Sequence, residues 1–271
     1  MDSFSPAEIA SNYADVGVKK VNRPLSNMII VGLVAGAIIA LGSAASNTAV
    51  YGVYDTWTAR TIAGLLFPFG LGIILLIGAD LFTGNCLITI SLLEKRCTAV
   101  QMLRNWLVIY LSNFLGAFLV AAGCALFGQL DYSGGALAVY TMKVATAKCS
   151  ISFQNGFVSG ILCNFLVSMG VLVSMSGKDT TGRILGAFLP VCYFVLCGFE
   201  HCVANMYYIS AGLLAKSIPA YAQLAAESGL DISALTPSNF FITNLIPVTL
   251  GNIVGGAFLG WVMWFCNLRK H

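Results

Sequence analysis

Six long apolar stretches dominate this sequence and restrict what the chain can fold into. They fall at roughly 26–47, 61–93, 103–128, 150–176, 184–214 and 241–267. An α-helix needs about 20 apolar residues to cross the hydrocarbon core of a bilayer, and each stretch reaches that length. With 58% hydrophobic residues, 9% charged residues and a mean hydropathy of +0.85, the chain is too apolar for a soluble globular domain. The sequence therefore predicts an all-α membrane protein with six spanning helices.

The positions of lysine and arginine predict how the chain is oriented. Cytoplasmic ends of membrane helices carry an excess of these residues. One set of helix ends holds Lys19, Lys20, Arg23, Lys95, Arg96, Arg104, Lys178, Arg183, Arg269 and Lys270. The opposite set holds only Arg60, Lys143, Lys148 and Lys216. Both termini are therefore expected in the cytoplasm, and the net charge of +3 is a topology signal that indicates no nucleic-acid binding.

Residues 1–25 precede the first span and contain the segment "SPAEIASNYADVGVKKV". This segment is typical of a weakly amphipathic helix, and its early acids and late basic residues are unlike a cleaved export signal. We expect a cytoplasmic helix that lies on the membrane surface or packs beneath the core; the alternative is a frayed tail.

The nine cysteines do not indicate disulfides or a metal site. Most sit singly inside predicted spans, where cysteine behaves as a small buried hydrophobe. Cys192, Cys197 and Cys202 recur every five residues, a spacing that does not keep them on one helical face. No metal, cofactor or catalytic group is expected.

An internal repeat relates the third and sixth helices. "NWLVIYLSNFLGAFL" at 105–119 aligns with "NLIPVTLGNIVGGAF" at 244–258. The aligned pairs include Asn105 with Asn244, Asn113 with Asn252, and Gly116 with Gly255. In the first and fourth helices, Gly32 and Gly36 likewise correspond to Gly156 and Gly160, consistent with close helix packing. Two three-helix halves, 26–128 and 149–267, are expected, and an odd number of crossings in each makes them inverted repeats.

The second and fifth apolar stretches are the unusual members of the two halves. Each is longer than one crossing needs and is interrupted by a glycine and polar cluster, "GADLFTGN" at 78–85 and "GFEHCVAN" at 198–205. We interpret both as broken helices. Irregular backbone at bilayer depth is tolerated where protein or a water-filled cavity satisfies its amides, so paired breaks point to a substrate path. Two ordinary long tilted helices are the alternative.

Asp80 and Glu200 occupy equivalent positions in these two clusters. An ionised side chain at the membrane centre costs roughly 3 kcal/mol unless it is paired. We assign both mainly to structure, as acceptors for amides exposed by the breaks or for Asn85 and Asn205. A direct role in transport is the alternative.

His201 breaks the repeat, because the aligned residue in the first half is Leu81. Imidazole titrates near neutral pH and can donate or accept a hydrogen bond. His201 is therefore the candidate for chemistry, with Thr83 in the opposite break as the hydroxyl that meets it. Lys148 begins the fourth helix on the external side and is expected to concentrate small anions. The alternatives are a purely structural histidine and a lone surface lysine.

These motifs resemble a known family. "GADLFTGN", "GFEHCVANM" and "FITNLIPVTLGNIVGG" are closely similar to signatures of the formate/nitrite transporter family, bacterial membrane channels for small monovalent anions. The resemblance covers residues from about 20 to 267. It implies an aquaporin-like protomer with broken second and fifth helices, assembled as a homopentamer in the bacterial inner membrane with one pore in each protomer.

The resemblance also assigns roles to individual residues. It implies that His201 is the central pore histidine and that Thr83 is its partner. The apolar constrictions are implied at Leu81, Phe82, Phe194, Phe67 and Leu71. Lys148 and Asn164 resemble the anion-attracting lysine and the vestibule asparagine. The segment "TGNC" at 83–86 departs from some members, so the loop that gates the cytoplasmic side is expected to differ.

The expected function is permeation of a small weak-acid anion, with formate as first choice and nitrite and hydrosulfide close behind. Crossing a dry constriction as an ion is expensive, so a proton supplied through His201 would lower the barrier and make flux depend on pH. An aquaporin-type facilitator for neutral solutes is the nearest rival, but the paired "NPA" motifs are absent from the sequence. A membrane-embedded hydrolase using Ser168 or Ser174 lacks an evident oxyanion hole. A purely structural membrane protein would need no broken helices.

Overall fold

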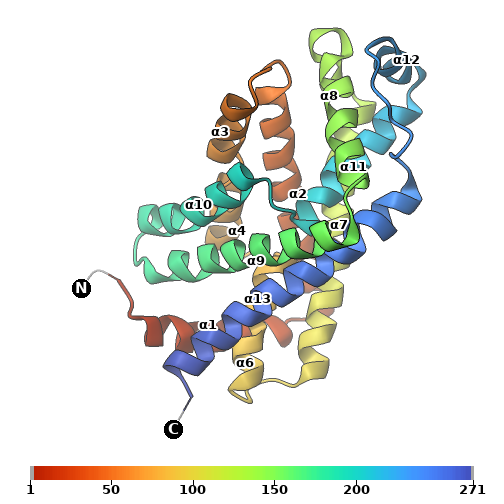
Figure 1. The fold of residues 1–271 in the computed structure, drawn as a ribbon. Coiled ribbons are helices and arrows are strands. Elements are labelled where there is room, and N and C mark those ends of the chain that lie inside the picture. Colours follow the sequence, from red (N-terminus) through yellow and green to blue (C-terminus); the bar gives the residue numbers. More distant parts are fainter. Residues whose placement is uncertain (1–2, 270–271) are drawn as a thin grey trace.

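The computed structural model describes residues 3–269; Lys270, one of the residues used to predict orientation, lies outside them. The described chain is helical and contains no strand (Figure 1). Its elements are α1 (Pro6–Val21), α2 (Leu25–Val50), α3 (Thr56–Leu66), α4 (Phe69–Ile77), α5 (Phe82–Asn85), η1 (Cys86–Ile88), α6 (Thr89–Leu93), α7 (Ala99–Leu126), η2 (Gln129–Asp131), α8 (Tyr132–Cys149), α9 (Phe153–Ser176), α10 (Thr180–Cys197), α11 (Cys202–Ser217), α12 (Pro219–Glu227), η3 (Asn239–Leu245) and α13 (Ile246–Asn267).

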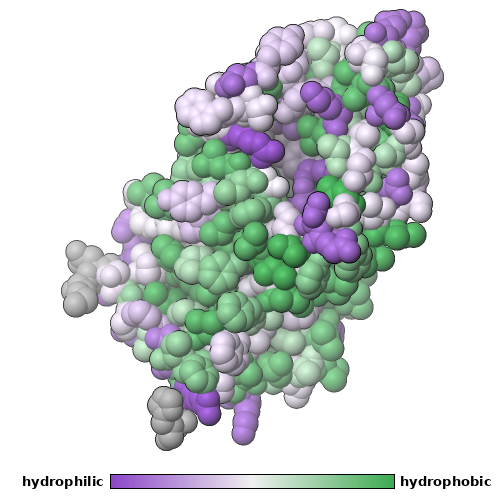
Figure 2. All heavy atoms as spheres, in the orientation of Figure 1, coloured by the Kyte–Doolittle hydropathy of each residue, from purple (hydrophilic) through white to green (hydrophobic). Residues whose placement is uncertain are grey.

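Six segments of the described chain are long and apolar enough to cross a membrane. They are Leu25–Val50, Thr56–Ile77, Ala99–Leu126, Phe153–Ser176, Thr180–Cys197 and Asn239–Asn267. Figure 2 shows apolar side chains over the middle of the visible face and hydrophilic ones gathered toward its two ends. The predicted six-helix membrane protein is confirmed.

The two halves pack alike. Helix α2 lies along α7, and α9 lies along α13 in the same way. Glycines allow both close approaches: a Cβ on Gly36 would lie 2.6 Å from Asn113 Cα, and one on Gly160 would lie 2.7 Å from the Val248 carbonyl oxygen. The expected small-residue packing is therefore present in both pairs.

Both expected helix breaks are present. Helix α4 ends at Gly78 with a φ of 73°, and α10 ends at Gly198 with a φ of 71°. This left-handed conformation is accessible to glycine at little cost and stops the helix. Helical structure resumes at α5 after residues 79–81 and at α11 after residues 199–201. The breaks therefore occur at matching positions in the two halves.

Helix α1 packs beneath the bundle. This is one of the two positions predicted for it, the other being on the membrane surface. It begins with a capping box in which Ser5 and Glu8 bond each other's backbone N–H groups, and these hydrogen bonds hold the pKa of Glu8 below its usual value. Ile9, Tyr13 and Val21 are buried against the rest of the chain. We call this side of the molecule the α1 face.

Helices α8 and α12 were not predicted from the sequence. They project from the opposite side of the bundle, together with α3 (Figure 1). Regular helix in α8 starts after Gly135, because Ser133, Gly134 and Gly135 have positive φ angles. Tyr221 of α12 donates a hydrogen bond to Asp131 at 2.6 Å, and burial together with this carboxylate raises the pKa of Tyr221 to about 12. We call this side the α8 face.

Candidate functional site

The two helix breaks meet inside the bundle. His201 Nε2, from the break between α10 and α11, lies 3.0 Å from the hydroxyl oxygen of Thr83 at the start of α5. Thr83 is completely buried and His201 is 3% exposed. The pair that was expected to meet across the repeat does so.

The second ring nitrogen of His201 has a structural task. His201 is the N-cap of α11, and its Nδ1 accepts a hydrogen bond of 3.1 Å from the Ala204 backbone N–H. Because a backbone N–H can only donate, the neutral imidazole must carry its proton on Nε2. Nε2 then donates to the Thr83 oxygen, and the Thr83 hydroxyl hydrogen is left to donate to a further acceptor.

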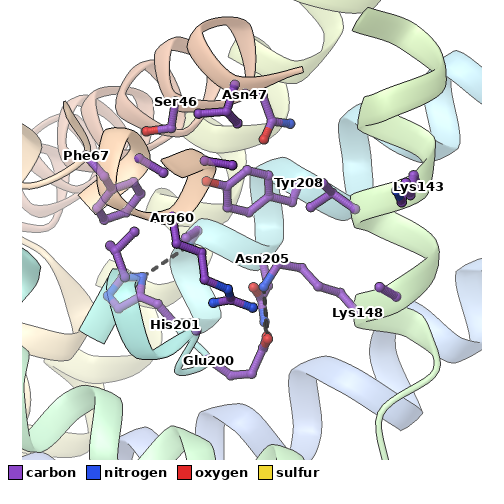
Figure 3. A pocket seen from close by; sticks show the side chains of 18 of the residues that line it. Ser46, Asn47, Arg60, Phe67, Lys143, Lys148, Glu200, His201, Asn205 and Tyr208 are labelled. Carbon is purple, nitrogen blue, oxygen red and sulfur yellow. Dashed lines mark hydrogen bonds and ion pairs between the residues drawn. The ribbon is translucent and has the colours of Figure 1, made fainter. Parts of the chain in front are cut away.

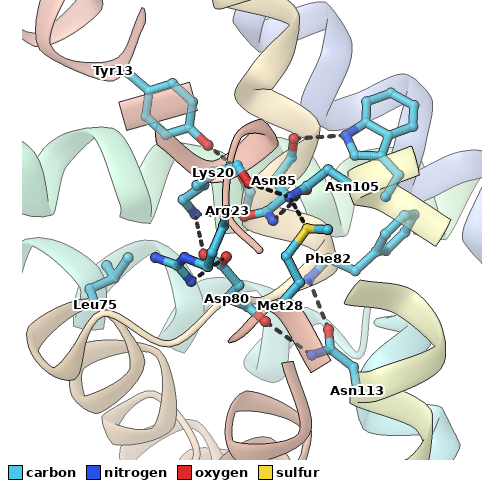
Figure 4. A network of polar contacts seen from close by, with 12 residues as sticks. Tyr13, Lys20, Arg23, Met28, Leu75, Asp80, Phe82, Asn85, Asn105 and Asn113 are labelled. Carbon is cyan, nitrogen blue, oxygen red and sulfur yellow. Dashed lines mark hydrogen bonds and ion pairs between the residues drawn. The ribbon is translucent and has the colours of Figure 1, made fainter. Parts of the chain in front are cut away.

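Asparagines from α7 and α13 hold the two breaks in matching ways. Asn113 accepts from the Phe82 N–H at 2.8 Å and donates to the Asp80 carbonyl at 3.0 Å (Figure 4). Asn252 accepts from the Cys202 N–H at 2.9 Å and donates to the Glu200 carbonyl at 3.0 Å. These side chains supply the bonds that the interrupted helices lack.

A second matching pair joins the ends of the breaks to the same two helices. Asn85 donates to Asn105 at 2.8 Å, and Asn205 donates to Asn244 at 2.8 Å. All four asparagines are completely buried. The repeat aligned them in sequence, and the structure joins them in space.

Each acid of the breaks is paired with a lysine. Asp80 lies 3.0 Å from Lys20 and 2.8 Å from Arg23, and Glu200 lies 3.0 Å from Lys148. Each lysine lies five residues before its half's first long helix, so Lys20 and Lys148 are equivalent positions. Both acids therefore form ion pairs within the chain, and their assignment to structure stays a prediction.

The expected partners of these acids need one correction. Glu200 does accept from Asn205, at 2.6 Å. Asp80 does not accept from Asn85. Its carboxylate instead binds Lys20 in the last turn of α1 and Arg23 just after this helix. Asn85 itself accepts a hydrogen bond from Lys20 at 2.6 Å. A cation satisfies a buried carboxylate better than an amide does, because it also neutralises the charge.

A cavity of about 490 Å³ opens from the α8 face toward the breaks (Figure 3). The charged residues that line it are Arg60, Lys143, Lys148 and Glu200. Three cations against one carboxylate give the lining a formal charge of +2. Such a cavity attracts small anions.

The deep end of this cavity is aromatic. Phe67 and Phe194 meet edge to face with ring centroids 5.6 Å apart, and Phe194 stacks on His201 at 5.8 Å. All three residues line the cavity and are at most 4% exposed. Thr83 is completely buried and is not part of the cavity lining, whereas its partner His201 is.

The other residues assigned by resemblance lie outside that cavity. Leu71 and Leu81 are buried. Phe82 packs edge to face against Tyr110 of α7 at 4.9 Å. Asn164 is completely buried and donates to the Thr83 carbonyl at 3.2 Å, so it supports the break rather than the cavity wall. Their roles along a permeation path stay predictions.

Sequence reasoning missed four polar residues of the cavity. Arg60 and Lys143 entered only the orientation count, and Asn47 and Tyr208 were not considered. Nothing in their local sequence marks them, because Arg60 belongs to α3 and Asn47 to α2, and only the fold brings them together.

Two inverted three-helix units whose second helices break and meet beside a charged cavity define a membrane transport protein. The sequence pattern described as "Formate/nitrite transporter" matches residues 7–266. The chain belongs to the formate/nitrite transporter family, and the expected resemblance is confirmed. It is accordingly a multi-pass membrane transport protein and not an enzyme.

Named relatives and solved structures agree with this family. The chain is 35% identical to the formate channel FocA of Haemophilus influenzae, with 94% of this chain and 91% of the relative covered. It is 32% identical to the formate channel FocA of Escherichia coli K12, over 100% of this chain and 96% of that protein. A solved "Pentameric formate channel with formate bound" superposes with a TM-score of 0.79 at 30% identity, covering 90% of this chain and 98% of that one.

Proposed function

We propose that the protein is a channel for small monovalent weak-acid anions, with formate as the main substrate. The observation that carries this proposal is the contact between His201 and Thr83 beneath a cavity of net positive charge. The names of the relatives favour formate over nitrite and hydrosulfide. Those two anions share the charge and size of formate and remain the alternatives.

The path follows from the order of the residues. The positive cavity concentrates the anion, and the rings of Phe67 and Phe194 remove its water. Past the rings, the anion meets Nε2 of His201 and the free hydrogen of Thr83. A second proton can enter the imidazole only if Nδ1 releases the Ala204 N–H, so proton transfer to the anion is coupled to opening of this cap. Flux should therefore rise as the pH falls.

The assembly and orientation belong to the same proposal. The solved relative is named as a pentamer, and we propose that this chain also forms a homopentamer with one path in each protomer. We propose that the α1 face and both termini lie in the cytoplasm of a bacterial inner membrane, an orientation that the excess of cations on this face supports. The α8 face and its cavity then face the outside.

Uptake of labelled formate into proteoliposomes between pH 5 and 8 tests the function, because this range extends about 1.5 units to either side of the pKa of a free histidine. His201→Asn keeps a side chain that can cap α11 and removes the titrating ring, whereas His201→Ala removes both. We expect His201→Asn to fold and to lose the pH dependence.

Two results would contradict the proposal. An unchanged pH profile in His201→Asn would exclude coupling through the ring. Glycerol flux that equals formate flux and is insensitive to His201 would instead indicate a neutral-solute facilitator.

A further inference from the structure

We propose that Arg60 binds the incoming anion in the cavity and selects planar anions that carry two oxygens. This inference rests on the proposed function and names a residue that determines its specificity. Four observations carry it: the pairing of Lys148, the position of Arg60, an unpartnered amide in the same cavity, and the shape of the guanidinium group.

Lys148, the cation expected to attract the anion, is already occupied. Its ammonium nitrogen lies 3.0 Å from both carboxylate oxygens of Glu200 and 5.3 Å from the centroid of the Tyr208 ring. Its repeat equivalent Lys20 binds Asp80 in the same way at the other break. The charge of Lys148 is therefore largely balanced, and its main task is to hold the break.

Arg60 is placed differently. It takes part in no salt bridge with the residues that the structure describes, and its one hydrogen bond goes to the Leu196 carbonyl at 3.4 Å. The guanidinium lies against Gly198, where an added Cβ would be 3.1 Å from its central carbon. Figure 3 shows it extending into the cavity toward Glu200 and Asn205. An unbalanced positive charge thus sits at the break that carries His201.

A second donor without a partner lies in the wall of the same cavity. Asn47 of α2 is 5% exposed and lines the cavity. Its amide nitrogen bonds no group in the part of the chain that is described. Buried amide donors without a partner are rare and costly, so this nitrogen is suited to a ligand that enters from the cavity.

The guanidinium group explains which anion is selected. Its planar fork of N–H groups matches two oxygens on one atom, as in formate or nitrite, and forms two parallel hydrogen bonds. Hydrosulfide offers one atom and cannot use the fork. Lys143 is a further exposed cation of the lining, but an ammonium group is a point charge that attracts all anions alike.

The test compares Arg60→Gln, Arg60→Lys and Lys143→Gln in proteoliposomes. For each variant, initial uptake is measured against concentration for formate, nitrite and hydrosulfide, with protein-free liposomes as background. Thermal unfolding in detergent is recorded for each, because Arg60 also bonds the carboxyl end of α10. We expect Arg60→Gln to raise the half-saturating concentration of formate and nitrite about fivefold and that of hydrosulfide much less. Arg60→Lys should recover little of this loss, and Lys143→Gln should shift all three anions equally and weakly.

The outcomes separate the two proposals. Absence of formate uptake by the unmodified protein would overturn the proposed function and this inference together. Normal uptake with an unchanged half-saturating concentration in Arg60→Gln would overturn the inference alone, as would full recovery by Arg60→Lys. A lower unfolding temperature of Arg60→Gln with an unchanged half-saturating concentration would show that Arg60 only stabilises the end of α10.

Discussion

Asparagine side chains at each break make the bonds that main-chain groups make in a continuous helix. Asn113 and Asn252 each accept from one backbone N–H and donate to two carbonyls. The amide group is suited to this because it carries both donors and acceptors without a charge. The same geometry repeats in both halves, although the residue between the two bonded main-chain groups is Leu81 in the first half and His201 in the second. The scaffold is therefore symmetric, and only the second half carries a titratable imidazole at this position.

Asn252→Ala should lower the stability of the protein strongly. It leaves the Cys202 N–H and the Gly160 and Glu200 carbonyls without their partner, and each such buried group costs about 1–3 kcal/mol. Thermal unfolding in detergent measures the effect. Asn267→Ala is the control, because within the described residues the side chain of this asparagine bonds only the Met263 carbonyl near the end of α13. Equal unfolding temperatures for the two variants would exclude the clamping role.

Among the elements, α1 is the one that closes the break of the first half from below. Tyr13 donates to the Gly84 carbonyl at 2.7 Å, and the C-terminal turn of α1 supplies Lys20 to Asp80. Arg23, just after the helix, adds a second cation to the same carboxylate. In the second half, Lys148 is the one cation among the described residues that pairs with Glu200.

Asp80→Asn should loosen α1. Removing one partner of a buried ion pair costs about 3–5 kcal/mol, and less here because Lys20 and Arg23 stay partly exposed. Hydrogen exchange of residues 6–21 should then become faster. The control Arg96→Gln breaks the exposed pair with Asp15, which is worth about 1 kcal/mol at most. Unchanged exchange in Asp80→Asn would show that α1 is held by apolar packing alone.

The sequence predicts the features that depend on local composition. It does not predict those that depend on contacts between residues far apart in the chain. Long apolar stretches indicate the spans, because a helix needs a minimum length to cross a membrane. Gly78 and Gly198 indicate the breaks, because the left-handed conformation that ends each helix favours glycine. Helix α8 lies beyond the spans, where no such demand applies. The pair between Lys148 and Glu200 joins residues 52 apart in sequence, so the sequence does not reveal that the lysine expected to attract anions lies 3.0 Å from a carboxylate.

At the scale of the whole molecule, apolar side chains cover the outside of the bundle. Those most exposed along α7 include Leu103, Leu107 and Leu111. In a monomer they face lipid, and in the proposed pentamer part of this surface packs against a neighbour. Helix α7 runs from the α1 face to the α8 face, so its two ends report the orientation of the whole protein.

Cysteines at the two ends of α7 test that orientation. Val100 and Phe127 are 76% and 85% exposed, and each is replaced by cysteine in a background where Cys97, Cys197 and Cys266 are serine. A membrane-impermeant maleimide should label Phe127→Cys on intact cells and Val100→Cys only after permeabilisation, because the cations cluster at the Val100 end. The reverse pattern would place the cavity in the cytoplasm. Arg60 would then meet anions leaving the cell, and the electrostatic attraction inferred for entry would instead act on export.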